Sequence, residues 1–215
     1  MTDYPDWLRD FVTAAPRTEV PDHFRPPGNG ERAAAVLILF GEGPEGPDLL
    51  LLQRADTLRK HAGQPAFPGG GIDPGDGGPV GAALREAAEE TGLDPSGVAV
   101  LTEMPELYVS HSGYRVTPVV GWWREPSAVS AGDPGEVASV ARVPITELTD
   151  PANRLRIRGP SGFVSPAFRV RDMLVWGFTA GILHNVLRIG GWEQPWDESR
   201  IEDLPPEVID LATRE

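Results

Sequence analysis

The apolar residues in the first third of the chain fall into short continuous runs, and such runs predict buried strands. Residues 33–40 (AAAVLILF) have the length and composition of one strand, and residues 48–53 (DLLLLQ) predict a second. The segment between them, GEGPEGP, has the glycines and prolines of a hairpin loop. Further strands are predicted at 98–103, 114–123 and 136–143.

Helical spacing of small and apolar residues is confined to a few segments. Residues 80–91 predict one helix, which Gly92 would end, because glycine readily adopts the left-handed conformation that closes a helix. A second helix is predicted from Asp172, a capping residue, to Arg188, and we interpret His184 within it as a core or edge residue. Shorter helices are predicted at 7–13 and after the proline pair 205–206.

This order of elements, with strands first and helices interspersed irregularly, predicts an α/β fold in which helices cover a mixed sheet. The 215 residues suffice for one domain with a core and two short additions. We therefore expect an N-terminal segment with a short helix at 1–30, a central domain at 31–190 and an acidic C-terminal tail at 191–215, which ends in a short helix.

The charge of the chain restricts its partners. Acidic residues outnumber basic ones by 32 to 19, which gives a formal net charge of -13. A field of this sign repels nucleic acid and anionic membranes, so we expect neither as a partner. It also repels phosphorylated small molecules, so a site for such a substrate needs local positive charge from a metal, basic side chains or backbone N–H groups.

The chain has no cysteine, which excludes disulfides, thiolate zinc sites and cysteine nucleophiles. The first residues are acidic and lack the basic and then apolar pattern of a signal peptide. The longest apolar run, 33–40, is far shorter than the roughly 20 residues that span a bilayer. We therefore expect a cytoplasmic protein.

Three glutamates in the predicted helix 80–91 have the spacing of metal ligands. Glu86 and Glu90 are four residues apart, which places their Cβ atoms about 6 Å from each other, and Glu89 lies at the edge of the same face. Magnesium binds oxygen ligands at about 2.1 Å and keeps several waters, so two flexible carboxylates can share one ion. Arg85, four residues before Glu89, can pair with that carboxylate and orient it. The alternative is a solvated helix face, because like charges at this spacing cost only about 0.2–0.5 kcal/mol.

A glycine-rich loop precedes this helix. Gly69, Gly70 and Gly71 stand in a segment from 54 to 79 that has no clear helical or strand pattern. Glycine lets the backbone approach a ligand closely, and successive N–H groups of a turn can bind phosphate oxygens. We therefore expect these three glycines to contact the substrate.

The glutamate segment resembles the Nudix box, G-x5-E-x7-R-E-U-x-E-E-x-G-U. Residues 85–93 (REAAEETGL) agree with its second half at every specified position. The first half departs, because the box glycine falls on Gly71 and the first glutamate on Gly77. If Gly70 is the box glycine instead, Asp76 stands near the acidic position with one residue inserted. The resemblance implies an α/β/α Nudix sandwich with a mixed β-sheet and a divalent metal, Mg²⁺ or Mn²⁺.

A second resemblance is narrower. Residues 50–70 are similar to the signature of the coenzyme A pyrophosphatase branch, L-L-T-x-R-[SA]-x3-R-x3-G-x3-F-P-G-G, and depart from it only at Leu52, where threonine is expected. This resemblance implies cleavage of coenzyme A or acyl-CoA at its pyrophosphate to 3′,5′-ADP and (acyl-)4′-phosphopantetheine. Arg54 and Arg59 belong to the signature. They form a basic island with Lys60 and His61, and we expect the protein to bind its anionic substrate with this island.

These resemblances lead to one assignment of roles and leave alternatives open. Glu86 and Glu90 are the leading metal ligands, and Arg85 and Glu89 are the catalytic candidates. Glu89 is either a third ligand or the base that takes a proton from the attacking water. The partner is a small CoA-like nucleotide, and a homodimer stays open. The alternative functions are a Nudix hydrolase for ADP-ribose or a dinucleotide, and a Nudix-fold binding or regulatory module without turnover.

Overall fold

The chain forms two compact units, each assembled from two separate stretches of sequence. The computed structural model describes residues 3–25, 32–58, 61–109 and 112–212. Unit 1 comprises residues 1–41 and 67–129, and unit 2 comprises residues 42–66 and 130–215. The predicted metal-binding glutamates therefore belong to unit 1, whereas Arg54 and Arg59 belong to unit 2.

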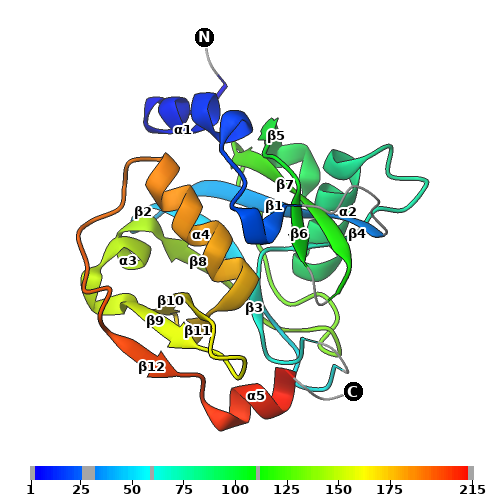
Figure 1. The fold of residues 1–215 in the computed structure, drawn as a ribbon. Helices are drawn as coiled ribbons and strands as arrows, with labels where there is room; N and C mark the ends of the chain where they lie inside the picture. The colour runs from blue at the N-terminus through cyan, green and yellow to red at the C-terminus, as the bar shows by residue number, and fades with distance from the viewer. Residues whose placement is uncertain (1–2, 26–31, 59–60, 110–111, 213–215) are drawn as a thin grey trace. The chain divides into compact units, whose positions relative to one another are not determined.

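The sheet of unit 1 is built around strand β1 (Arg32–Gly43), which pairs in parallel with β7 (Tyr114–Trp123) (Figure 1). β4 (Gly69–Gly71) pairs antiparallel with β1. β5 (Val98–Glu103) and β6 (Leu107–Val109) both pair antiparallel with β7. Most of the apolar run of β1 is buried, as expected for a strand with a parallel partner in a covered sheet. The predicted α/β class with a mixed sheet is confirmed.

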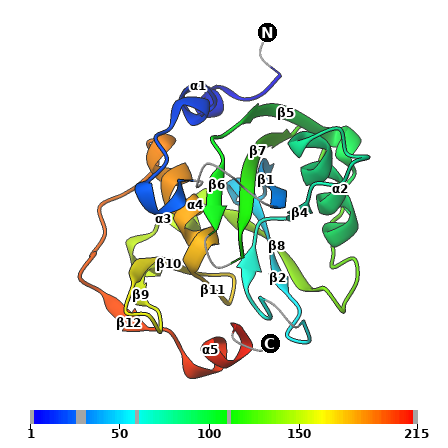
Figure 2. The ribbon, with the colours of Figure 1, turned by 45° about the vertical axis from the view of Figure 1, so that its right-hand side comes forward.

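Helix α2 (Pro79–Thr91) packs against β4 and β7 (Figure 2). It begins with proline, whose missing N–H would have no partner in the first helical turn. It ends at Gly92, which has a φ of 68° and donates its N–H to the carbonyl of Ala88 at 2.9 Å. Ala82, Ala83 and Ala87 are buried, and their small side chains let the helix lie close to the sheet. The helix predicted at 80–91 is confirmed.

Aromatic side chains hold the N-terminal helices of unit 1. The Trp7 ring meets the rings of Phe40 and Trp122 edge-on, with centroid distances of 6.0 and 6.1 Å, and Phe11 meets Phe40 at 5.1 Å. Such contacts bury large apolar surfaces with a fixed geometry. The predicted helix at 7–13 is therefore confirmed as part of a series of short helices: η1 (Asp6–Leu8), α1 (Arg9–Ala14), η2 (Ala15–Arg17) and η3 (Asp22–Phe24). One more 3₁₀ helix, η4 (Pro95–Gly97), follows α2.

Unit 2 contains strand β2 (Gly46–Arg54), which pairs antiparallel with β8 (Val137–Pro144) and β3 (Pro65–Ala66). Its other sheet has the strand order β11–β10–β9–β12, in which β12 is parallel to β9. These strands are β9 (Arg154–Arg158), β10 (Val164–Val170), β11 (Met173–Val175) and β12 (Ile201–Asp203). The helices are α3 (Ile145–Thr149), η5 (Pro151–Asn153), α4 (Gly177–Ile189) and α5 (Pro206–Ala212). None of the helices in the described part of the chain is long and apolar enough to span a bilayer.

The helix predicted to start at Asp172 is wrong at its beginning. Arg171 and Asp172 have positive φ angles of 48° and 61° and lie in the turn between β10 and β11. Asp172 therefore does not cap a helix, and α4 begins five residues later, after Trp176. The strands predicted at 33–40, 48–53, 98–103, 114–123 and 136–143 and the short helix after 205–206 are confirmed within a few residues.

Candidate active site

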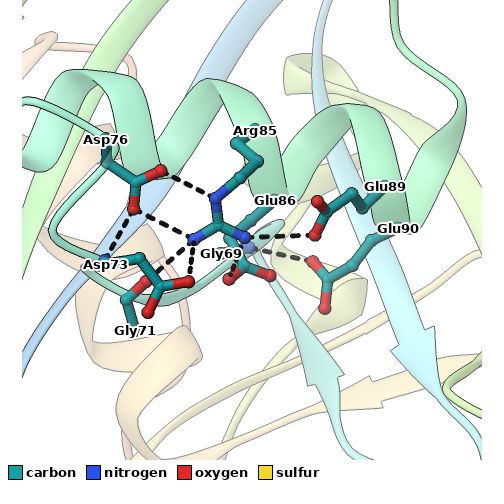
Figure 3. Close-up of polar contacts among 8 residues, drawn as sticks. All are labelled: Gly69, Gly71, Asp73, Asp76, Arg85, Glu86, Glu89 and Glu90. Atoms are coloured by element: carbon teal, nitrogen blue, oxygen red, sulfur yellow. Dashed lines mark hydrogen bonds and ion pairs between the residues drawn. The ribbon is translucent and has the colours of Figure 1, made fainter.

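Arg85 of α2 connects the acidic turn before the helix with the glutamates of the helix (Figure 3). Its Nε and Nη2 donate to the two carboxylate oxygens of Asp76 at 2.7 and 3.0 Å. Nη2 also donates to the carbonyl of Gly71 at 3.1 Å. Nη1 donates to Glu86 at 2.9 Å and to Glu89 at 3.1 Å. The predicted pairing of Arg85 with Glu89 is confirmed, and the planar guanidinium uses each of its three nitrogens.

The Asp76 carboxylate is the principal partner of Arg85. The hydrogen bond from Arg85 is the largest cause that lowers the pKa of Asp76, and the backbone N–H of Asp73, at 2.7 Å, lowers it further. The same pair raises the pKa of Arg85 above its ordinary value. Both groups therefore stay charged across the neutral pH range. Asp76 is missing from the predicted site residues, although its place near the acidic position of the Nudix box is the signal that identifies it.

The carboxylates of Glu86 and Glu90 converge on adjacent residues of β4. The N–H of Gly69 donates to Glu90 Oε2 at 2.9 Å, and Glu90 is only 6% exposed. A Cβ atom added to Gly70 would lie 2.5 Å from both Cδ and Oε1 of Glu86. Glu89 lies at the edge of this group, with a side chain that is 60% exposed. The helical spacing thus brings Glu86 and Glu90 to one short stretch of backbone, as Figure 3 shows.

The segment Gly69–Gly71 is a strand, so its interpretation as a loop is wrong. It pairs with residues 34–36 of β1, and a Cβ atom at Gly69 would lie 2.3 Å from the carbonyl oxygen of Ala35. Only glycine permits this approach of two backbones. The sequence predicts a turn whose N–H groups are free to bind phosphate oxygens. The N–H of Gly69 instead donates to Glu90. Contact of these glycines with a substrate stays a prediction.

The carboxylates of Glu86 and Glu90 are chemically suited to bind a hard divalent cation. Glu86 and Glu90 offer only oxygen donors, which Mg²⁺ and Mn²⁺ prefer. Among the residues that the structure describes, no group of three or more His, Cys, Asp or Glu side chains is arranged to hold a metal. Two carboxylates with waters and substrate oxygens are the coordination usual for Mg²⁺. The assignment of Glu86, Glu89 and Glu90 as ligands stays a prediction.

The predicted basic island lies in unit 2. Arg54 is half-buried at the end of β2, and its backbone N–H donates to the carbonyl of Gln64 at 3.0 Å. His61 has a φ of 56°, and its Nδ1 lies 3.1 Å from Gln64 Oε1. Arg59 and Lys60 lie outside the described residues. The expected contacts of Arg54 and Arg59 with the substrate therefore stay predictions.

Comparison with known proteins identifies the family. Residues 30–161 match the family model of the NUDIX domain. The uncharacterized Nudix hydrolase NudL of Escherichia coli O7:K1 (strain IAI39 / ExPEC) is 43% identical over 165 residues, which cover 74% of this chain and 83% of that protein. NudL of Shigella flexneri is 42% identical over 191 residues, which cover 86% and 94%. The solved NUDIX domain of Shewanella oneidensis NrtR, complexed with ADP ribose, is 20% identical over 56% of this chain and 77% of that chain, with a TM-score of 0.45.

The chain therefore belongs to the Nudix family, and the resemblance of residues 85–93 to the Nudix box is confirmed. Its class is that of a Nudix pyrophosphohydrolase, which acts on a nucleoside diphosphate linked to another moiety. Nudix hydrolases generally use divalent metal ions. In the first half of the box, which departs from the pattern, Asp76 supplies the carboxylate that holds Arg85.

The contact between Gly70 and Glu86 leads to a test of carboxylate placement. Gly70→Ala is expected to displace the flexible end of Glu86 and leave the fold intact, because the clash does not involve backbone. A displacement of about 1 Å can lower turnover by about 10²-fold. The measurement is kcat on a nucleoside diphosphate substrate, alongside the unfolding temperature. Gly75→Ala is the control, because a Cβ atom there meets nothing within 4 Å. Unchanged turnover in folded Gly70→Ala would contradict this account.

The Asp76–Arg85 pair leads to a second prediction. Asp76→Asn removes the charge that orients Arg85, and the loss of such a supporting partner typically lowers activity by about 10–100-fold. Asp73→Asn is a control with the same charge change, because Asp73 is 74% exposed and 3.8 Å from Arg85. Steady-state kcat/KM of both variants is the measurement. Equal losses in the two would show that net charge, and not the Asp76 contact, is responsible.

Proposed function

We propose that the chain hydrolyses coenzyme A or acyl-CoA at the pyrophosphate. Water attacks one phosphorus atom, the P–O–P bond breaks, and the products are 3′,5′-ADP and 4′-phosphopantetheine or its acyl form. The observation that carries the proposal is the agreement of residues 50–70 with the branch signature at all specified positions but Leu52. The coenzyme brings a pyrophosphate and a ribose phosphate, so in a chain of net charge -13 it needs a local group of cations.

The fold itself requires several residues of the signature. These positions can be distinguished from those that are available to recognise the substrate. Gly63 has a φ of 65°, and a Cβ atom there would lie 2.8 Å from Asp56 Oδ1. Phe67 is buried in the core at 4% exposure, and Gly69 is required by its approach to β1. The arginines of the signature, Arg54 and Arg59, are the positions left with chemistry for phosphate. We assign them to the phosphates of the coenzyme.

We assign Glu86 and Glu90 as the protein ligands of Mg²⁺ or Mn²⁺. When bound, the cation supplies charge neutralisation at the pyrophosphate oxygens and lowers the pKa of a water molecule. Arg85 holds the carboxylates of Glu86 and Glu89 in fixed orientations. Glu89, which is the most exposed of the three, is a further ligand or accepts the proton of the attacking water. This assignment rests on the convergence of Glu86 and Glu90 on β4.

Metal dependence is the first test of this proposal. Turnover is expected to disappear in EDTA and to return with Mg²⁺ or Mn²⁺. Glu90→Gln should weaken Mn²⁺ binding, followed by electron paramagnetic resonance, and lower kcat by at least about 10²-fold, because an amide is a neutral and poorer ligand. Glu125→Gln, at an exposed glutamate of unit 1, is the control. Full turnover in excess chelator, or normal Mn²⁺ binding and turnover in Glu90→Gln, would contradict the assignment.

A substrate panel is the second test. Coenzyme A should be hydrolysed with a higher kcat/KM than ADP-ribose, NADH or nucleoside triphosphates, with both products identified by mass. Arg59→Ala should lower kcat/KM for coenzyme A. The loss should correspond to about 1.5–3 kcal/mol of transition-state stabilisation, which is the scale of a charge-assisted contact. Arg158→Ala, which removes an exposed arginine of unit 2, serves as the control. If ADP-ribose or NADH is preferred by about tenfold, the coenzyme A proposal fails and the family assignment stands.

A further inference from the structure

Helix α5 of unit 2 contacts both the sheet of β9 to β12 and the signature loop, residues 55–64 between β2 and β3. Two of its residues, Val208 and Ile209, pack against a buried apolar cluster, which consists of Leu155, Ile157, Ala167 and Leu204. Further along the helix, Leu211 reaches the loop. Its Cδ1 lies 3.2 Å from the position that a Cβ atom of Gly63 would occupy. Figures 1 and 2 show α5 beside this loop.

Backbone hydrogen bonds fix both ends of the signature loop. The N–H of Arg54 donates to the carbonyl of Gln64 at 3.0 Å, and the N–H of Gly63 donates to the carbonyl of Ala55 at 3.4 Å. The N–H of Ala55 in turn donates to the carbonyl of Glu136 at 2.9 Å. Gly63 is therefore bonded to the residue that follows Arg54, so a displacement of the backbone at Gly63 is passed to Arg54.

The conformation of Gly63 makes the contact with α5 possible. Gly63 has a φ of 65°, in the left-handed region that favours glycine, and it is a specified position of the branch signature. A Cβ atom there would lie 2.8 Å from Asp56 Oδ1 as well as 3.2 Å from Leu211 Cδ1. A larger residue would displace both side chains. The signature glycine thus provides the space in which Leu211 meets the backbone of the loop.

The order of the signature loop bears on the affinity for substrate. A loop that becomes ordered only when it binds a ligand loses part of the binding free energy, and a loop that is already held in the free protein does not. Arg54, which we assign to the phosphates, directly precedes this loop. Glu86 and Glu90, the proposed metal ligands, belong to unit 1. Support of the loop should therefore act on substrate binding rather than on the chemical step.

We propose that α5 braces the signature loop, with Leu211 as a positioning residue, and thereby raises the affinity of the chain for its anionic nucleotide substrate. This inference rests on the proposed function, because that function assigns Arg54 to the phosphates of coenzyme A. The loop lies within the residues that match the family model, 30–161, whereas α5 follows them. Recognition of the substrate therefore depends on an element that lies outside the matched family domain.

Leu211→Ala tests the brace by separating binding from chemistry. It removes the side-chain atoms that meet Gly63, so KM for coenzyme A should rise by about three- to tenfold, the scale of the cost of ordering one side chain. The value of kcat should stay within about twofold, because the carboxylates of unit 1 are unchanged. Leu211→Met keeps an apolar side chain of similar volume and should restore KM. Glu207→Gln, at an exposed position of the same helix, is the control.

Hydrogen exchange of the substrate-free chain measures the loop directly and requires no turnover. A peptide covering 54–64 should exchange faster in Leu211→Ala than in the wild type, by at least about threefold, while a peptide from α2 of unit 1 is unchanged. Unaltered KM in folded Leu211→Ala, or unaltered exchange of the loop, would overturn the proposal. So would a fall in kcat at constant KM, or an equal effect of Glu207→Gln. If the wild type does not hydrolyse coenzyme A, the proposed function fails, and exchange of the loop alone decides whether α5 is a brace.

Discussion

The ion pair of Arg85 with Asp76 is the interaction on which the candidate active site depends. It joins the turn before α2 to the helix, and through Gly71 it also joins the helix to β4. The turn and the helix are already in close contact, because a Cβ atom at Gly81 would lie 1.9 Å from the carbonyl oxygen of Asp76. The guanidinium can then hold Glu86 and Glu89 from a fixed position, and Glu90 is held separately by β4.

The fold of unit 1 could be predicted largely from local pattern, whereas part of unit 2 could not. A continuous apolar run predicts β1, and helical spacing with a glycine stop predicts α2, each within a few residues of its observed bounds. Strands β11 and β12 have only three residues each, and β9 (RLRIR) is rich in arginine, so these strands give little apolar signal. Asp172 has the residue type of a helix cap, but its positive φ places it in a turn, which sequence pattern does not distinguish.

In the candidate site too, local sequence pattern predicts the features that depend on neighbouring residues. It does not predict contacts between residues that are far apart in the sequence. The common face of Glu86 and Glu90 follows from helical spacing alone. The pairing of Gly69–Gly71 with β1 joins residues more than thirty positions apart, so local sequence pattern predicts a loop where the structure has a strand. The sequence indicates Asp76 as a box position but does not indicate its pairing with Arg85, because the inserted residue changes the spacing between the two. Its role depends on a turn closed by the bond from the Asp73 N–H.

The central claim is that Glu86 and Glu90 hold a divalent cation at the point where they meet β4. The most direct measurement is the anomalous scattering of manganese in crystals of the chain soaked with Mn²⁺ and a non-hydrolysable coenzyme A analogue. The account predicts a manganese peak with carboxylate oxygens of Glu86 and Glu90 at about 2.1 Å, the distance usual for a hard divalent cation of this kind. A peak elsewhere, or analogue bound with no manganese between these carboxylates, would contradict it.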